Sequence, residues 1–147
     1  MNSCAVISKD FDVLSKAELY AILALRVQVF CVEQNCPYQD LDNQDQQAQH
    51  VFIKDNGIIM AYARIIKGKQ GVYHIGRVVV DKRYRNQGLA TVIMQACIDE
   101  LKNKAKIIEL SAQSYLTEFY QGLGFKSTGE YYLEDDIPHE KMQLILD

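Results

Sequence analysis

One stretch of the chain changes its hydrophobic period part-way along, and this change constrains the fold more than any other feature. Residues 78–80 are three consecutive valines between Gly76 and Asp81, as expected of a buried strand. Across residues 89–101 the apolar side chains recur at helical spacing, so the period changes from two residues to about 3.6. A strand, a turn and an amphipathic helix must therefore follow one another here.

The turn between this strand and this helix has the features of an anion site. At a helix N-terminus several backbone NH groups lack acceptors, and the helix dipole favours negative charge. Gly88 removes the side chain where the backbone would approach a phosphate, and Arg83 and Arg85 add positive charge. We therefore predict a ligand that carries a pyrophosphate. The alternative is an ordinary strand-to-helix connection.

Two short signatures carry a resemblance to a known superfamily. Residues 85–90 read R-x-x-G-x-A, which is neither the three-glycine dinucleotide fingerprint nor a P-loop. This pattern resembles the pyrophosphate loop of the GNAT superfamily of acyl-CoA-dependent N-acyltransferases. Further along, Tyr120 stands four residues before a Gly-Phe pair, which matches the second signature of that superfamily.

The resemblance extends to both ends of the chain. Residues 25–42 are similar to the L-R-x-x-V-F-V-x-E-Q-N-C-P-Y-x-[DE]-x-D segment of the ElaA-like branch, and residues 133–139 are similar to its E-D-G-I-P-H tail. Cys31 replaces the usual Val, and Asp136 replaces the usual Gly. Gln113 stands where the wider superfamily often has Asn. Of these departures, Asp136 is the one that could alter the substrate mouth.

Length and composition agree with a small soluble enzyme. A chain of 147 residues with 48% hydrophobic content fits a single domain, residues 1–147. A net charge of −3 argues against a nucleic-acid-binding surface. No export signal is visible, and the longest apolar stretch, residues 19–32, is too short to span a bilayer. We therefore expect a cytoplasmic protein with no membrane contact.

The cysteines and histidines show no metal-ligand spacing and no C-x-x-C pair. We therefore expect no metal, and unpaired thiols in a reducing compartment. The four cysteines are Cys4, Cys31, Cys36 and Cys97.

The order of the predicted elements fits the fold that the resemblance implies. Residues 15–18 form a capping box before a first helix, and residues 55–57 are the strongest hairpin signal. The polar stretch 31–49 is a candidate binding loop. The strand that begins at Ile107 needs a helical crossover and should run parallel to the strand that ends at Val80. Other strands are expected at about residues 5–7, 50–54, 58–66, 125–132 and 140–146, and a short helix at 115–121.

The resemblance implies an α/β fold with a mixed, mostly antiparallel central sheet, two splayed parallel strands, and helices on both faces. Splaying exposes backbone NH and C=O groups, which the amide-rich pantetheine arm of acetyl-CoA can satisfy like an added strand. Acetyl-CoA is thus the implied cosubstrate. The residues expected to hold it are Val78, Val79, Val80, Arg85, Asn86, Gln87, Gly88, Leu89, Ala90, Thr91 and Gln113.

The implied reaction transfers an acetyl group from acetyl-CoA directly to a primary amine within a ternary complex. We expect Tyr120 to meet the departing sulphur and Glu33, which follows the first helix, to act as general base. The competing bases are His50, His74, Glu109, Glu134 and His139. The candidate substrate contacts are Arg26, His50 and His139.

Each of these substrate contacts has an alternative. Arg26 lies within an apolar helical stripe and fits a structural ion pair at least as well. His50 and His139 fit surface or structural positions. We expect the acceptor to be a small-molecule or peptide amine. The sequence leaves open whether the protein forms a homodimer. The second hypothesis is a non-catalytic regulatory module that binds acyl-CoA. The presence of Tyr120 argues against it, because a module that only binds does not need a donor beside the sulphur.

Overall fold

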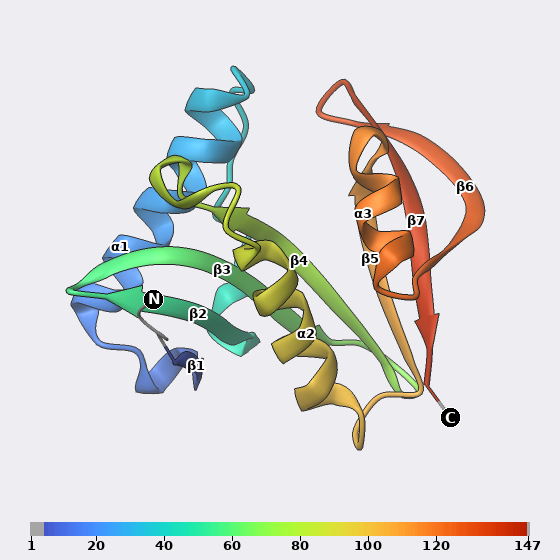
Figure 1. Ribbon diagram of the computed structural model, residues 1–147, viewed down its shortest axis with the longest axis horizontal. Coiled ribbons are helices and arrows are strands. Elements are labelled where there is room, and N and C mark those ends of the chain that lie inside the picture. Colours follow the sequence, from blue (N-terminus) through green and yellow to red (C-terminus); the bar gives the residue numbers. More distant parts are fainter. Residues whose placement is uncertain (1–4, 147) are drawn as a thin grey trace.

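A computed structural model describes residues 5–146 as one seven-stranded sheet in the order β1-β2-β3-β4-β5-β7-β6. Among the described residues, every neighbouring pair of strands is antiparallel except β4 and β5, which run parallel. This sheet confirms the predicted fold class (Figure 1). The strands and helices are β1 (Val6–Asp10), α1 (Lys16–Val27), β2 (Gln49–Asp55), β3 (Ile58–Lys67), β4 (Val72–Val80), α2 (Leu89–Leu101), β5 (Ile107–Gln113), α3 (Thr117–Gly122), β6 (Lys126–Glu134) and β7 (Ile137–Ile145).

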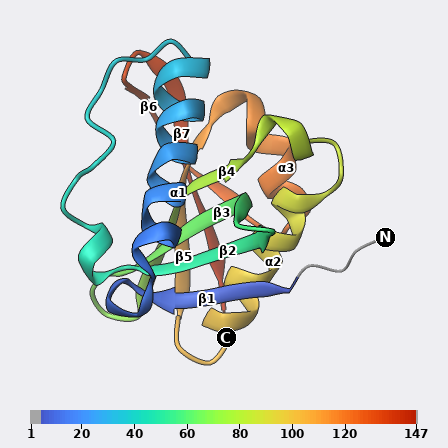
Figure 2. The ribbon, with the colours of Figure 1, turned by 90° about the vertical axis from the view of Figure 1, so that its left-hand side faces the viewer.

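Helices cover both faces of the sheet, as Figures 1 and 2 show from two sides. On one face, Ile22 and Leu25 of α1 pack against Phe52, Ile59 and Tyr62 of β2 and β3. α1 continues without a break into a π-helical turn, Gln28–Glu33. The sheet is therefore buried on both sides in its first half, which makes β3 a continuous apolar strand.

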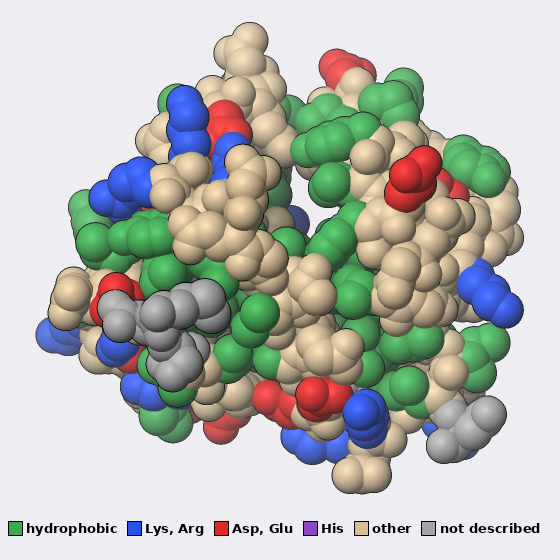
Figure 3. Space-filling model, in the orientation of Figure 1, with side chains coloured by type: hydrophobic (Ala, Val, Ile, Leu, Met, Phe, Trp, Pro, Cys, Tyr) green, Lys and Arg blue, Asp and Glu red, His purple; other side chains and the backbone are tan. Residues whose placement is uncertain are grey.

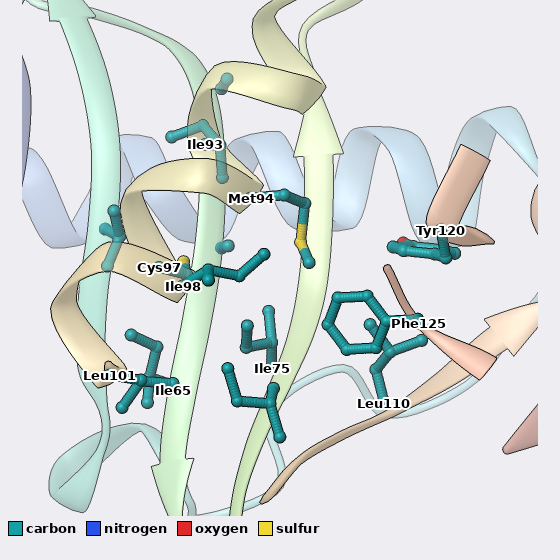
Figure 4. Packing of buried hydrophobic residues seen from close by; sticks show 14 of the residues in the cluster. Ile65, Ile75, Ile93, Met94, Cys97, Ile98, Leu101, Leu110, Tyr120 and Phe125 are labelled. Carbon is teal, nitrogen blue, oxygen red and sulfur yellow. The ribbon is translucent and has the colours of Figure 1, made fainter. Parts of the chain in front are cut away.

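The opposite face carries the larger core (Figure 4). Ile93, Met94 and Cys97 of α2 are fully buried there. Phe125 joins the same cluster from the segment that follows α3. The helical spacing of these α2 residues is the pattern that predicted the helix, so the prediction of α2 is confirmed.

The two parallel strands stay together over a short distance only. β4 and β5 pair at Val72–Ile107, Tyr73–Ile108 and His74–Glu109, and beyond these three pairs they separate. The register of β4 against β3 shifts within the next residues, and Arg77 there has a φ of 51°. A bulge of this kind bends its strand and increases the local twist. The bend turns β4 away from β5, and Figure 1 shows both strands diverging from a common end.

Two local motifs predicted in the first half of the chain are confirmed, namely the capping box before α1 and the turn between β2 and β3. Ser15 accepts a hydrogen bond from the NH of Glu18, and the Glu18 carboxylate accepts one from the NH of Ser15. Asn56 and Gly57, with φ of 50° and 78°, join β2 to β3 in a two-residue turn. Both motifs satisfy backbone groups locally, which is why they could be predicted without knowledge of the fold.

The last two strands are longer than predicted. β6 continues to Glu134 and β7 begins at Ile137, so residues 133–139 form a hairpin rather than a tail. Asp135 and Asp136 make its turn with φ of 51° and 63°. Aspartate tolerates this left-handed conformation better than most residues, although glycine adopts it more readily. Cys31, Cys36 and Cys97 are free thiols, as expected, whereas Cys4 lies outside the described residues.

A buried ion-pair network holds the long segment between α1 and β2. Its members are Arg26, Arg64, Arg77, Asp40, Asp42 and Asp45. Arg26 is fully buried and lies 2.9 Å from Asp40 and 2.7 Å from Asp45. The structural ion pair considered for Arg26 is therefore confirmed. The substrate contact is wrong, because the guanidinium does not reach solvent.

Replacing Arg26 with methionine should destabilise the protein by about 3–5 kcal/mol, because Asp40 and Asp45 would stay buried and each would lose one of its two arginine partners. Urea unfolding followed by circular dichroism measures the loss. Lys102→Met is the matched control, since it breaks an exposed pair with Asp99 and should cost less than about 1 kcal/mol. Equal stability of the two variants would contradict the role given to Arg26.

Acid should weaken this protein between about pH 4 and pH 2. Burial alone would raise the pKa of Asp42, but hydrogen bonds from Arg64 and from the NH of Gln44 outweigh it and lower the pKa to about 2. A carboxylate with a lowered pKa stabilises the fold above its unfolded pKa, and this contribution is lost as pH falls toward the folded value. Asp42→Asn should be less stable at pH 7 and lose less of its stability between pH 4 and pH 2. A pH series of thermal melts tests this, and parallel curves for both proteins would refute it.

Candidate active site

A groove of about 830 Å³ opens where β4 and β5 diverge. One wall is formed by the π-helical turn after α1 and by β4, and the other by β5, α3 and the β6–β7 hairpin. The N-terminus of α2 lies at the edge of the same groove. Figure 3 shows the surface hollowed between the two halves of the molecule. The groove thus exists because the parallel pair does not stay closed.

The start of α2 presents unpaired backbone donors at this edge. Gly88 precedes the helix with a φ of 77°, a left-handed conformation that other residues adopt only with strain. The first helical hydrogen bond runs from the NH of Val92 to the carbonyl of Gly88 at 3.1 Å. The NH groups of Leu89, Ala90 and Thr91 therefore have no acceptor within the helix. No atom lies within 4 Å of a Cβ built on Gly88, so the space beside it is open.

Arg85 connects the loop before α2 to both sides of the groove. Its Nε donates to the carbonyl of Val80 at 3.1 Å. Its two terminal nitrogens donate to the two carboxylate oxygens of Glu33, at 2.5 and 3.0 Å. These hydrogen bonds lower the pKa of Glu33 below its ordinary value. A carboxylate held in this way is a weak proton acceptor, which counts against Glu33 as general base.

The exposed edge of β4 offers further backbone groups. Asp81 donates its NH to the carbonyl of Met60 on the β3 side at 2.8 Å. Because successive residues of a strand alternate, the NH of Val79 points to β3 and the NH of Val80 points into the opening. An extended ligand lying along this edge could pair with β4 as an added strand would.

Tyr120 reaches the groove from α3. Its ring packs edge-on against Phe119 and Phe125, and the residue is only 7% exposed (Figure 4). Burial raises the pKa of Tyr120 to about 12, so the hydroxyl stays protonated at neutral pH. Within residues 5–146 this hydroxyl makes no hydrogen bond to protein, while the residue lines the groove. A donor without a protein partner is thus held in a rigid aromatic setting.

The far wall of the groove is polar. Glu109, Ser111 and Gln113 alternate along β5 with the buried Leu110 and Ala112, so the polar side chains share the face that α2 does not cover. Ser111 shares a 2.5 Å hydrogen bond with the hydroxyl of Tyr132. His139 lies beside them on β7, opposite Gln113 in register.

Contacts across the top of the groove join its two walls. The amide of Gln113 donates to the side-chain oxygen of Gln34 at 3.4 Å. The thiol of Cys36 donates to the carbonyl of Asp135 in the β6–β7 turn at 3.7 Å. The segment after α1 and the final hairpin therefore meet over the groove and restrict access from that side.

Most of the predicted site residues meet in this groove, and three do not. Gln87 is exposed and does not line it. Arg26 and His50 are both fully buried away from it, so the substrate contact expected for His50 is also wrong. Both ring nitrogens of His50 are taken, by the hydroxyl of Tyr62 at 2.6 Å and the carbonyl of Asp45 at 2.9 Å. The predicted residues that line the groove are Glu33, Val78, Val79, Val80, Arg85, Asn86, Gly88, Leu89, Ala90, Thr91, Gln113, Tyr120 and His139.

The sequence interpretation missed part of the far wall. Ser111 and Tyr132 were not singled out, although the alternation of polar and apolar residues in 107–113 could have indicated a polar face of β5. The bulge at Arg77 was also missed, although Gly76 directly before it, a glycine inside a strand, could have indicated an irregularity there.

Comparison with known proteins decides the family. Residues 16–146 match the acetyltransferase (GNAT) domain. The chain belongs to the GNAT acetyltransferase family. It is 40% identical to the protein ElaA of Escherichia coli over 132 residues, which cover 86% of each chain. It is also 39% identical to a UPF0039 protein of Schizosaccharomyces pombe, over 99% of this chain and all of the other.

Solved structures agree with this assignment. The crystal structure of Escherichia coli ElaA superposes with a TM-score of 0.89 at 38% identity, over 95% of this chain and 99% of that one. An acyl-CoA N-acyltransferase from Pseudomonas aeruginosa gives a TM-score of 0.91 at 37% identity, over 97% and 99% of the two chains. The predicted membership of the ElaA-like branch of the GNAT superfamily is confirmed.

Residues 5–146 contain neither a candidate metal site nor a helix that could span a membrane. No group of three or more His, Cys, Asp or Glu side chains in this part of the chain could hold a metal ion. None of the helices described there is long and apolar enough to cross a membrane.

Proposed function

We propose that this protein is an N-acetyltransferase that moves the acetyl group of acetyl-CoA directly to a primary amine. The observation that carries the proposal is the N-terminus of α2, with its unpaired NH groups, at the mouth of the opening between β4 and β5. Membership of the GNAT acetyltransferase family supports it.

The groove fits coenzyme A at two points. The NH groups of Leu89, Ala90 and Thr91, together with Arg85 and Asn86, would hold the diphosphate, because a helix N-terminus is a ready anion site. The edge of β4 around Val78–Val80 would hold the amides of the pantetheine arm in the opening beside β5. Gln113 lines the same opening from β5.

Acyl transfer makes three demands on the groove. The thioester carbonyl must be polarised, and the backbone NH of Val80, which points into the opening, is a donor placed to do so, whereas that of Val79 points to β3. The leaving thiolate needs a hydrogen-bond donor, and the hydroxyl of Tyr120 is a protonated donor without a protein partner within residues 5–146. Because a phenol is a weaker acid than a thiol, we propose a hydrogen bond or transient donation rather than full transfer.

The third demand is a neutral amine. A lysine-like amine is neutral about once in a thousand molecules or fewer near pH 7, a deficit of roughly 4–5 kcal/mol, so a base is useful. Glu33, the predicted base, is engaged by Arg85 and has a lowered pKa. We therefore assign Glu33 to positioning Arg85 at the diphosphate loop. A non-catalytic acyl-CoA-binding module would not need a phenol donor at the position of Tyr120.

Gly88→Ala tests the diphosphate site. The added Cβ would lie where the phosphate approaches the backbone, so affinity for coenzyme A should fall about tenfold or more by calorimetry. Gly57→Ala is the matched control, because Gly57 has a φ of 78° and equally open surroundings but lies in the β2–β3 turn. Both variants should lose about 1 kcal/mol of stability from backbone strain. Equal coenzyme A affinity in the two would overturn the diphosphate assignment.

Tyr120→Phe tests the sulphur-side donor. The ring would keep its packing on Phe119 and Phe125, so the fold should be unchanged. We expect kcat to fall about 100-fold with little change in KM for acetyl-CoA, because the lost contact forms with the leaving group. Release of free thiol in the presence of a panel of amines provides the assay. Tyr131→Phe, at a residue 70% exposed, is the control, and an unchanged kcat for Tyr120→Phe would exclude the role.

A further inference from the structure

His139 is a buried histidine of the groove, and its hydrogen bond to the backbone fixes which ring nitrogen can accept a proton. The residue is 6% exposed and lines the groove from β7. Its Nδ1 lies 2.7 Å from the carbonyl oxygen of Ile137, two residues back in the same strand. Its ring stacks on that of Tyr132, at 6.1 Å between centroids and an angle of 12°. The ring is thus fixed in both position and orientation.

The contact with Ile137 decides which nitrogen carries the proton. A carbonyl oxygen only accepts hydrogen bonds, so Nδ1 must be the donor. In the neutral ring Nε2 then has no proton and presents its lone pair. A backbone carbonyl that fixes the Nδ1–H tautomer is the arrangement that prepares a histidine to accept a proton at Nε2.

The carboxylate of Glu134 lies beside the nitrogen that would become positively charged when His139 accepts a proton. Its Oε2 lies 3.3 Å from Nε2 of His139, and its side chain is 55% exposed. A carboxylate at this distance can accept a hydrogen bond from Nε2 once that nitrogen carries a proton. The other charged groups of this wall are Asp135 in the hairpin turn, Lys141 on β7 and Glu109 on β5.

Two other carboxylates of the groove, those of Glu109 and Glu33, are already engaged by neighbouring side chains. Glu109 accepts from Gln143 at 2.7 Å and lies 3.4 Å from Lys141. Burial alone would raise the pKa of Glu109, but these two partners outweigh burial and lower that pKa below its ordinary value. Glu33 is bound on both oxygens by Arg85. His139 differs from both, because its Nδ1–H tautomer leaves the Nε2 lone pair without a hydrogen-bond donor, although the carboxylate of Glu134 lies 3.3 Å away.

We propose that Nε2 of His139 is the general base that takes the proton from the acceptor ammonium, an inference that rests on the proposed N-acetyl transfer. The ammonium gives one proton to Nε2, and the neutral amine attacks the thioester carbonyl carbon. The C–N bond forms, the C–S bond breaks, and the second amine proton goes to the thiolate through the site of Tyr120. The imidazolium then loses its proton to solvent beside Glu134. The acceptor class is a strongly basic primary amine, which needs this step.

The kinetic test uses two probe amines and one matched variant. His139→Asn keeps a side-chain NH for the carbonyl of Ile137 and removes Nε2. With the ε-amine of N-α-acetyllysine amide, kcat/KM of the variant should fall about 100-fold. With hydroxylamine, which is already neutral at pH 7, it should fall less than about threefold. Equal losses for both amines, or no loss for either, would overturn the proposal.

A second measurement does not depend on finding an acceptor. Long-range ¹H–¹⁵N correlation spectra of the whole protein at about pH 9 distinguish the two neutral tautomers, and the chain has only three histidines to assign. We expect the His139 signals, identified by their loss in His139→Asn, to show Nδ1 protonated and Nε2 bare. The Nε2–H tautomer would overturn the proposal. Absence of coenzyme A binding would instead overturn the proposed function, so the two failures are distinguishable.

Discussion

The separation of β4 from β5 after three paired residues is the constraint on which the rest of the structure depends. A closed parallel pair would satisfy its own backbone groups and leave no groove. The bulge at Arg77 bends β4 away instead, and the NH of Val80 is left facing the opening. Backbone groups inside a protein need partners, so an opening of this kind is stable only if water or a ligand supplies them. The sheet therefore has unpaired backbone groups at its centre, where β4 and β5 no longer pair.

The surroundings of this opening are held by charge and by aromatic packing. The Arg26 network anchors the segment after α1, and each of its arginines faces an aspartate. On the other side Tyr120 is fixed between Phe119 and Phe125. Two packed walls thus flank backbone donors that have no protein partner within residues 5–146. This combination favours preorganised binding, in which a ligand causes little rearrangement of the protein.

The fold could be predicted largely from local patterns. The capping box at Ser15, the turn at Asn56 and the period change before α2 each depend on neighbours in sequence, and the structure contains all of them. Long-range contacts gave no such signal. Arg26 and His50 have the residue types of substrate contacts, yet their partners Asp40, Asp45 and Tyr62 bury them elsewhere. The pairing of Glu33 with Arg85, 52 residues away, likewise depends on the fold.

Amide hydrogen exchange followed by NMR, with and without coenzyme A, tests the central claim most directly. Filling the opening should slow exchange at the NH of Val80 and at those of Leu89, Ala90 and Thr91. The NH of Val79 already faces β3 and should exchange at the same rate in both samples. Protection confined to other segments, with Val80 and the start of α2 unchanged, would contradict the account.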